Sequence, residues 1–341
     1  MRKAVWESGL LIGEQNKCNS TTLNNIKKEI EIMAIHKPSD LALEKKNFAM
    51  LISGSPGLGK TTLACSAPKP LVFDFDRGID RMEYSYIPQY SQCDSYSEFL
   101  NDLETADYKA CETVIIDTGG SLVQFMQDWA KRQESKASRN MQAMYGVIKR
   151  ETNRLLWQIK EADKKNLIVI FHTTEQTKGD NIITRLSCEG STKDNVWTLI
   201  DFGGHMFTKG GKTFIGFTPT DEYYAKGTHG IKGEYEVPRL KPDGSTPNVF
   251  LTNLFESANK HIVNEVEAGN KYFEIVEAGK SLIDTVVDAD TANSVIEKFK
   301  TMEHVKTSRI ELAALMKAKL DELNLVMDNG KYRKADGKEK E

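Results

Sequence analysis

The chain has 341 residues, with 46 Lys and Arg against 49 Asp and Glu, a formal net charge of −3 and 39% hydrophobic residues. This composition suits one large globular domain with a smaller one, and the near-neutral charge excludes a wholly basic nucleic-acid coat protein. The 5 cysteines are scattered without a CxxC pair, and no apolar run approaches the roughly 18 residues of a membrane span. We therefore predict a reduced, cytoplasmic protein without a disulfide framework, structural zinc or membrane contact.

Residues 1–45 form a polar N-terminal extension with one predicted helix. Its apolar residues, Leu23, Ile26, Ile30 and Met33, are spaced by three and four positions, which is the pattern of a single helical stripe. We expect this helix to pack on the next domain or on a neighbouring subunit.

Residues 46–225 have the pattern of an α/β domain. Short continuous apolar runs predict buried strands at Phe48–Ile52, Pro70–Phe75, Thr113–Ile116 and Leu167–Phe171. Continuous runs, rather than alternation, indicate a sheet that is covered on both faces. Segments of helical periodicity separate these runs, so the sheet is predicted to be mostly parallel and flanked by helices.

The remaining chain is predicted to contain hairpins, a loop and a helical region. Glycines punctuate two short strands, His205–Thr208 and Thr213–Thr218. Residues 226–253 are rich in Gly and Pro and predict a loop or flap. Residues 254–328 predict two or three helices, including Thr291–Phe299 and Ser308–Leu323. Residues 329–341 carry mixed charge and predict a disordered tail.

A phosphate-binding motif follows the first predicted strand. The motif GxxxxGK[ST] is matched in full by Gly54, Ser55, Pro56, Gly57, Leu58, Gly59, Lys60 and Thr61, and Thr62 follows it. Glycines let the backbone N–H groups of such a loop converge on an anion where a helix begins. Lys60 would place its charge on the β- and γ-phosphates, and the Thr61 hydroxyl would bind Mg²⁺. The motif predicts a site for ATP and Mg²⁺.

Two further strands end in aspartate. Asp117 ends the apolar run from Thr113, at the position where a P-loop ATPase holds the water shell of its metal. Asp74 and Asp76 lie on the same side of the strand that follows the P-loop helix, near the sheet edge where ligands bind. We predict Asp76 as the base that activates water. The alternative is that one of these two carboxylates only caps the following turn.

The strand Leu167–Phe171 is followed by His172. A polar side chain at this position would face the γ-phosphate and could report its loss to the next loop. The alternative is a buried, satisfied histidine or a cap.

In this order, the features resemble the RecA-type branch of P-loop ATPases, which carry a hydrolytic carboxylate on the strand directly after the P-loop helix, as Phe73–Asp76 does. Several segments resemble, more narrowly, the phage-encoded AAA/RecA-like family, which includes short single-strand annealing proteins of phage recombination systems. These segments are Ala67–Asp74, Met144–Gly146 before a predicted helix, the strand ending at His172, and Leu199–Asp201. The resemblance covers roughly residues 48–235.

The resemblance implies roles for several residues. Asp76 occupies the position of the family's catalytic glutamate but is one methylene shorter, and His172 matches the family's sensing position. Lys226, in the segment Lys226–Gly230, corresponds to a lysine that can reach the γ-phosphate of a neighbouring subunit; the arginine position of that motif is Thr228 here. A homo-oligomer is therefore implied.

Two basic segments, Lys131–Asn140 and Gln176–Asn195, are expected to be mobile and would line a groove for single-stranded DNA. The predicted contacts are Lys131, Arg132, Lys136, Arg139, Lys178, Arg185 and Lys193. Basic side chains in such segments can follow a phosphate backbone. The alternative is an ordinary solvated charge run, and few aromatic residues are present to stack on bases.

The sequence thus predicts a RecA-like ATPase that acts on single-stranded DNA in phage recombination, annealing or replication. Its C-terminal helices would dock a single-strand-binding or replication protein, or a neighbouring subunit. One alternative is a nucleotide-gated DNA-binding scaffold with negligible turnover, which the short Asp76 side chain favours. A helicase-type motor and a small-molecule kinase are further alternatives.

Overall fold

The computed structural model describes residues 45–178, 181–188 and 192–335. The chain forms two compact units, one comprising Leu43–Glu267 and the other containing Ala268–Glu341. The helix predicted within residues 1–45 lies outside the described residues. In the part of the chain that the structure describes, no helix has an apolar stretch long enough to cross a bilayer.

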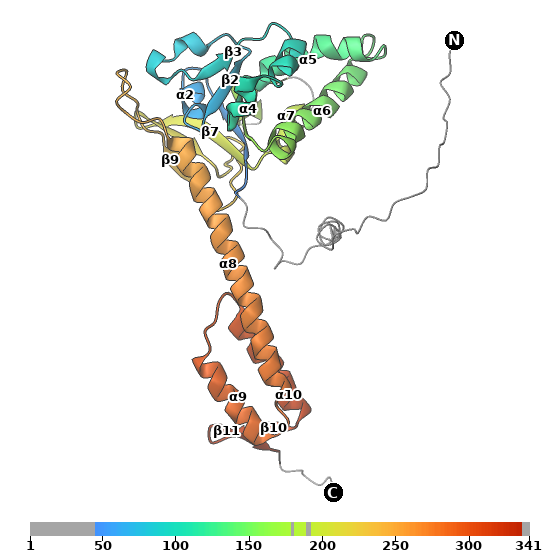
Figure 1. Ribbon diagram of the computed structural model, residues 1–341, viewed down its shortest axis with the longest axis vertical. Coiled ribbons are helices and arrows are strands. Elements are labelled where there is room, and N and C mark those ends of the chain that lie inside the picture. Colours follow the sequence, from blue (N-terminus) through green and yellow to red (C-terminus); the bar gives the residue numbers. More distant parts are fainter. Residues whose placement is uncertain (1–44, 179–180, 189–191, 336–341) are drawn as a thin grey trace, which may run out of the picture. The chain divides into compact units, whose positions relative to one another are not determined.

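The helices and strands alternate through most of the first unit (Figure 1). The helices are α2 (Lys60–Ala64), α3 (Tyr96–Asp102), α4 (Ala106–Ala110), α5 (Gly119–Gln133), α6 (Met141–Trp157), α7 (Thr192–Leu199), α8 (Phe250–Asp284), α9 (Ala289–Thr301) and α10 (Ser308–Glu322). The strands are β1 (Ala49–Gly54), β2 (Pro70–Asp74), β3 (Gln89–Ser91), β4 (Thr113–Asp117), β5 (Asn166–Lys178), β6 (Asn181–Leu186), β7 (Phe202–Lys209), β8 (Lys212–Gly216), β9 (Glu234–Glu236), β10 (Leu325–Asp328) and β11 (Lys331–Lys334).

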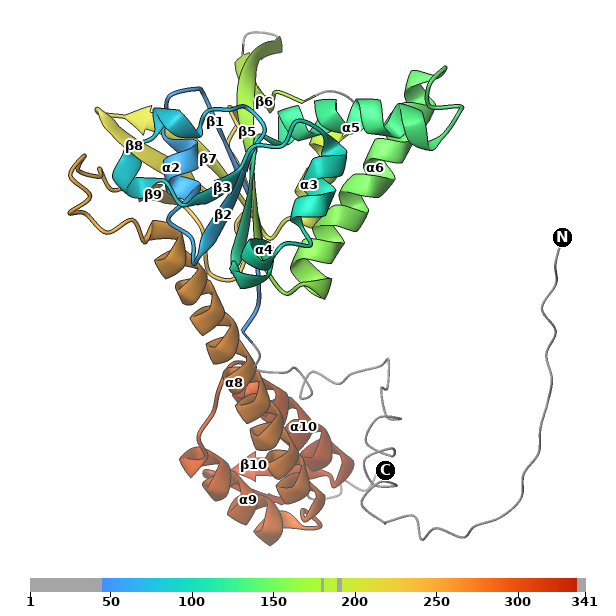
Figure 2. The same cartoon turned by 45° about the horizontal axis from the view of Figure 1, so that its top comes forward.

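The central sheet is mostly parallel, as predicted. Its strand order is β3-β2-β4-β5-β1-β7-β8-β9, and β6 pairs with β5. The strands from β3 to β7 in this order are parallel to their neighbours, whereas β8 and β9 are antiparallel additions. Helix α2 lies on one side of the sheet and α3, α5 and α6 lie on the other (Figure 2). Buried apolar runs therefore form the sheet interior, which is covered on both faces.

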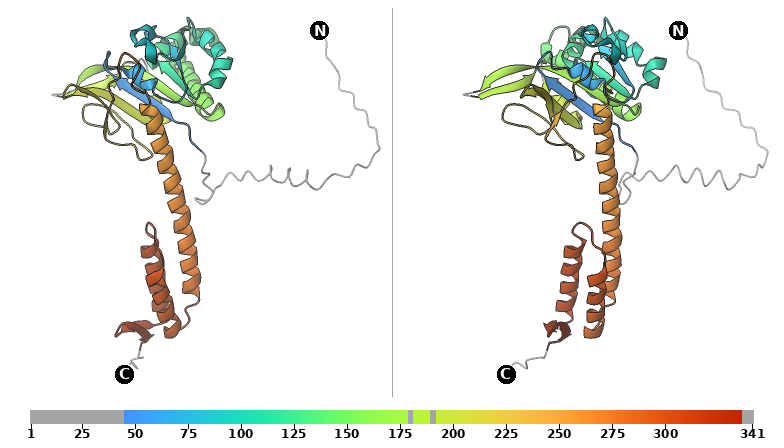
Figure 3. Two further views of the ribbon diagram at one scale, coloured as in Figure 1. Left: turned by 60° about the vertical axis from the view of Figure 1, so that its left-hand side comes forward. Right: turned by 90° about the vertical axis from the view of Figure 1, so that its left-hand side faces the viewer.

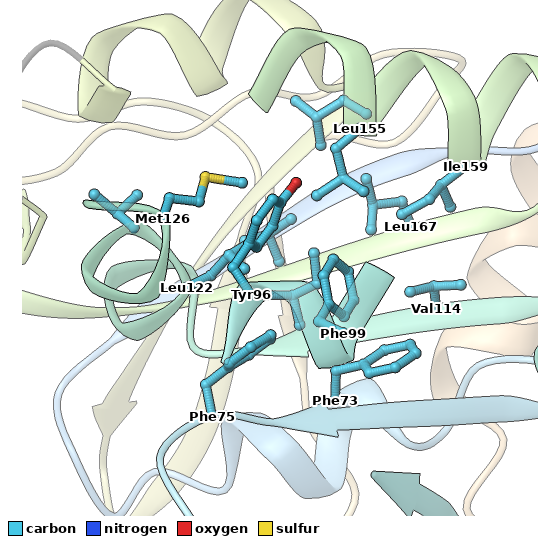
Figure 4. Packing of buried hydrophobic residues seen from close by; sticks show 14 of the residues in the cluster. Phe73, Phe75, Tyr96, Phe99, Val114, Leu122, Met126, Leu155, Ile159 and Leu167 are labelled. Carbon is cyan, nitrogen blue, oxygen red and sulfur yellow. The ribbon is translucent and has the colours of Figure 1, made fainter. Parts of the chain in front are cut away.

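Alternate residues of each strand enter two separate apolar cores. Val114 and Ile116 of β4 belong to the core beneath α3, α5 and α6, whereas Ile115 belongs to the core beneath α2 and the start of α8. Figure 4 shows the first core, in which Phe73 meets Phe99 edge-to-face at 4.7 Å between ring centroids. Because this packing holds the strands from both sides, the carboxyl ends of β1, β2, β4 and β5 are kept in register.

The predicted flap and helical region are divided differently in the structure. Helix α8 begins at Phe250, inside the segment 226–253 that was predicted to be a loop, and β9 also lies within that segment. The early start follows from packing, because Leu251, Leu254 and Phe255 are buried against the sheet. Likewise, Met144–Gly146 lie inside α6 rather than before it.

The second unit is a small helical region closed by a β-hairpin. The end of α8 packs with α9 and α10 around one apolar cluster (Figure 3). The prediction of a disordered tail from residue 329 is wrong as far as Lys334, because β11 pairs with β10. Tyr332 anchors this strand: its ring packs on the cluster, and its backbone bonds to the Asn293 side chain at 2.8 and 3.0 Å. Residues 336–341 lie outside the described residues.

Candidate functional site

The ends of four strands place the predicted site residues at one edge of the sheet. Gly54 of β1 pairs with His172 of β5, and Asp74 of β2 pairs with Asp117 of β4. Strand β5 lies between β1 and β4. The parallel register therefore brings together residues that are far apart in the sequence.

The P-loop connects β1 to α2 as the motif predicts. Gly59 precedes α2 with φ 81° and ψ 28°, a left-handed conformation that glycine adopts without steric cost. Gly54 has no room for a side chain, because a Cβ there would lie 2.7 Å from the Met206 carbonyl oxygen of β7. These two glycines allow the chain to turn sharply between the strand and the helix.

Lys60 is buried at the start of α2. Its ammonium donates to the carbonyl oxygens of Gly54 at 2.9 Å and Ser55 at 2.8 Å. Burial lowers the pKa of Lys60, and the nearby charges of Asp117 and Asp76 oppose this shift. A phosphate on the loop would offer this desolvated ammonium an anionic partner in place of two neutral carbonyls.

Thr61 and Asp117 meet as a metal-binding pair should. The Thr61 hydroxyl donates to Asp117 Oδ2 at 2.6 Å. Burial raises the pKa of Asp117, and the charges of Asp76 and Asp74 raise it further. A cation near Asp117 would relieve this concentration of negative charge, and the hydroxyl and carboxylate oxygens are ligands that suit Mg²⁺.

The oxygen atoms of Thr61 and Asp117 fit a Mg²⁺ ion whose other ligands come from a bound nucleotide and water. Among the described residues, no group of three or more His, Cys, Asp or Glu side chains could hold a metal alone. Mg²⁺ at nucleotide sites is commonly held by one or two protein groups, with phosphate and water as the other ligands. Thr61 and Asp117 would be the protein groups.

The structure separates the two aspartates at the end of β2. Asp74 is buried and accepts hydrogen bonds from the backbone N–H groups of Gly78 and Ile79, at 2.9 and 3.0 Å, and from the side chain of Gln92 at 2.9 Å. Asp74 therefore caps the turn after β2, which is the alternative that the sequence left open for one of the pair.

Asp76 faces the site and is only partly buried. It accepts hydrogen bonds from Ser121 and, at 3.3 Å, from Thr118, and its Oδ2 lies 3.3 Å from His172 Nε2. The hydrogen bond with His172 is the main cause that lowers the pKa of Asp76, and the Ser121 and Thr118 bonds act in the same direction against burial. The carboxylate is thus held ionised and oriented at neutral pH.

Thr118 and Ser121 were not identified from the sequence. Thr118 is the N-cap of α5 and also binds the Ser121 backbone. The signal was present, since a threonine directly after Asp117 with a serine three positions later is typical of a helix start. That these hydroxyls also reach Asp76 depends on the pairing of β2 with β4.

Lys226 lies at the end of α7, and its predicted reach to a neighbouring subunit stays a prediction. Its ammonium donates to the carbonyl oxygens of Ile200 at 2.6 Å and Trp197 at 3.3 Å, at the end of α7. Its backbone pairs with Gly203, three residues before the Met206 that pairs with Gly54. The structure does not bring Lys226 to the P-loop of its own chain, and its charge caps α7.

The first basic segment is partly helical. Lys131 and Arg132 lie in the last turn of α5, where both contact Asp128. Lys136 and Arg139 lie in the exposed turn that follows. The expectation of a mobile loop is therefore wrong for Lys131 and Arg132.

The second basic segment contains a hairpin and a helix rather than a loop. Strands β5 and β6 pair antiparallel, from Thr173 with Leu186 to Lys178 with Asn181. The hairpin projects beyond the sheet (Figure 2). The Arg185 guanidinium lies 4.4 Å from the Tyr224 ring centroid, a cation–π contact. Lys178 lies in β5 and Lys193 in α7, and their side chains are outside the described residues.

His205 lies beneath the P-loop and was also not identified from the sequence. It is buried, its Nδ1 lies 3.0 Å from Ser53 Oγ, and its ring stacks on Tyr223 at 4.4 Å. Burial lowers its pKa to about 4, and the charge of Lys60 adds to this shift. A single histidine within a strand carries no sequence signal for such a position.

We expect His205 to make the fold acid-sensitive. Below about pH 6.5 the unfolded chain binds a proton at His205, whereas the folded chain does so only near pH 4. Stability is therefore present above the unfolded pKa and falls as the pH drops, by about 2 kcal/mol between pH 7 and pH 5. Chemical denaturation at both pH values, compared with His205→Gln, isolates this contribution. Equal pH dependence in the two proteins would contradict it.

The fold and site define a P-loop nucleotide-binding protein built on a mostly parallel α/β sheet. Residues 46–229, more than half of the chain, match the model of a family described as an AAA domain. The chain belongs to this AAA domain family.

Further comparisons gave weaker likenesses. No curated protein matches the chain. The flagellar accessory protein FlaH of Methanocaldococcus jannaschii is similar at 12% identity and a TM-score of 0.28, over 49% of this chain and 75% of FlaH. A KaiC-like protein of Pyrococcus horikoshii is similar at 11% identity and a TM-score of 0.34, over 58% of this chain and 88% of that protein. The family assignment rests on the AAA domain match and on the site.

Proposed function

We propose that the protein binds ATP with Mg²⁺ and hydrolyses it, with Asp76 as the residue that orients and deprotonates water. The observation that carries this proposal is the separation of roles at the sheet edge. Thr61 and Asp117 pair with each other, while Asp76 is held apart by His172 and Ser121. One carboxylate is thus available for the metal and the other for water.

The residues of the chain divide the reaction between them. Lys60 binds and neutralises the phosphates, and Thr61 with Asp117 holds Mg²⁺, which when bound offsets charge that develops on the phosphoryl oxygens. Asp76 accepts the proton of the attacking water. His172, whose Nε2 lies 3.3 Å from Asp76 Oδ2, fixes the orientation of this carboxylate.

We further propose that nucleotide state controls the binding of single-stranded DNA. The support is continuity: β5 carries His172 at the site and continues directly into the hairpin with β6, which bears Arg185. A change at the γ-phosphate that moves His172 would act on the hairpin through one strand. The same proposal includes three further points that follow from the resemblance. The protein acts in phage recombination, annealing or replication, and it assembles into a homo-oligomer. Its C-terminal helices dock a single-strand-binding or replication protein.

The test is steady-state ATP hydrolysis with and without single-stranded DNA, with Lys60→Ala as the blank. We expect DNA to raise the rate several-fold, and we expect Arg185→Ala to weaken this stimulation while basal turnover is kept. Arg309→Ala, an exposed arginine of α10, is the matched control. ATP binding without turnover would favour the nucleotide-gated scaffold. Absence of ATP binding would refute the proposed function.

A further inference from the structure

A large cavity lies beside the P-loop. It has a volume of about 810 Å³ and is bounded on one side by Leu58, Gly59 and Thr62. The opposite wall includes Tyr235 of β9 and Phe250 of α8, whose rings meet edge-to-face at 6.5 Å. Gly59 belongs to the predicted phosphate-binding motif and Thr62 directly follows it, so the cavity adjoins that site.

The segment 237–249 joins β9 to α8 (Figure 1), and residues 237–240 and 247–249 of it line the cavity. It has little regular structure, yet hydrogen bonds attach it to the rest of the unit. In its middle part, the Tyr86 hydroxyl lies 2.9 Å from the Lys241 carbonyl oxygen and 3.0 Å from the Thr246 carbonyl oxygen. Near its end, the Asn248 side chain donates to the Thr62 carbonyl oxygen at 2.9 Å. We call residues 237–249 the flap.

Tyr86 acts on the cavity only through the flap. It lies in the short turn Tyr84–Tyr86 and does not line the cavity. Ser85 of the same turn donates to the Pro242 carbonyl oxygen at 3.2 Å. This turn therefore latches the flap from outside, while Asn248 ties it to the P-loop helix.

The lining has the chemistry of a nucleoside site. Its walls are mostly apolar and include two aromatic rings, which suit the flat face of a base. A few polar side chains, Arg239, Asn248 and Asn253, lie among them and can bond to the edges of a base or a ribose. A ligand whose phosphates lie on Lys60 and Thr61 would extend past Gly59 and Thr62 into this space.

We propose that the latched flap forms the wall of a nucleoside-binding pocket and that Tyr86 is the positioning residue that holds this wall in place. This inference rests on the proposed function, because it requires phosphates on the P-loop. In addition, much of the affinity for ATP comes from contacts with the base and ribose. This part of the affinity depends on Tyr86, which does not touch the ligand itself.

The test compares two ligands by isothermal titration calorimetry in the presence of Mg²⁺: ATP and inorganic tripolyphosphate. Tripolyphosphate offers the same phosphate chain without a nucleoside. Tyr86→Phe removes only the latching hydroxyl, and Tyr84→Phe is the matched control, because Tyr84 is 91% exposed in the same turn. Thermal unfolding of each variant checks that the fold is kept.

We expect wild type to bind ATP more tightly than tripolyphosphate. Tyr86→Phe should weaken ATP binding by about threefold to tenfold, as loss of the one O–H donor shared by the two carbonyls implies, and should leave tripolyphosphate binding unchanged. Tyr84→Phe should change neither. Three outcomes would overturn this inference but not the proposed function. Wild type could bind the two ligands equally well, Tyr86→Phe could bind ATP as tightly as wild type, or Tyr86→Phe could lose the same affinity for both ligands. If wild type bound neither ligand, or if Lys60→Ala bound both as well as wild type, the proposed function would fail and the inference with it.

Discussion

Asp76→Asn is expected to lower the turnover number for ATP by about 100- to 10,000-fold, the usual contribution of a positioned general base, and to leave ATP binding close to that of wild type. Asparagine keeps an oxygen that can accept hydrogen bonds from Ser121 and Thr118, but it cannot accept a proton from water. The measurement is single-turnover hydrolysis at saturating ATP, together with the dissociation constant for ATP.

Asp76→Glu is the informative control for this substitution. It retains the carboxylate and restores the longer side chain of the RecA-like family, so it should keep most of the turnover or exceed it. If wild type hydrolysed ATP slowly and Asp76→Asn left that rate unchanged, Asp76 would have no part in the chemistry. The nucleotide-gated scaffold would then be the better description of the protein.

Asp117→Asn is expected to abolish the contribution of Mg²⁺ to ATP affinity and to lower turnover by about 100-fold or more, since a charge that stabilises the transition state is lost. Asparagine still accepts the hydrogen bond from Thr61, so the local structure is kept. Because burial raises the pKa of Asp117, the ionised carboxylate is disfavoured in the folded state. We therefore expect the variant to unfold at the same temperature as wild type or a higher one.

The measurement is ATP binding and hydrolysis with Mg²⁺ and with EDTA. Wild type in EDTA should behave like Asp117→Asn in Mg²⁺, and EDTA should have little further effect on the variant. Asp80→Asn serves as the control, because Asp80 is an exposed carboxylate in the turn after β2. A full response of Asp117→Asn to Mg²⁺ would show that another group holds the metal.

Much of the first unit could be predicted from the sequence, because its strands are continuous apolar runs buried on both faces. The four predicted runs correspond to β1, β2, β4 and the first part of β5. The short strands β3 and β9 were not predicted, since three residues are too few to show a periodic pattern. They form strands because they pair with the edges of β2 and β8. The hairpin of β10 and β11 was missed for a similar reason, because its strands are short and only Leu325 and Tyr332 pack on the apolar cluster.

The candidate site shows the same division. The sequence by itself determined the P-loop and the presence of carboxylates at the ends of β2 and β4, because these depend on local spacing along the chain. That the Thr61 hydroxyl bonds to Asp117 was decided by the fold. Only the tertiary structure decided that Asp74 caps a turn while Asp76 faces His172. It alone also placed Lys226 at the end of α7 and Tyr86 on the flap. The partners that cap Asp74 are close in the chain, but either aspartate could have taken that role. The physical reason is that the roles of Asp76, Lys226 and Tyr86 are set by partners far away in the sequence, and such partners meet only when the strands pair and the two cores pack.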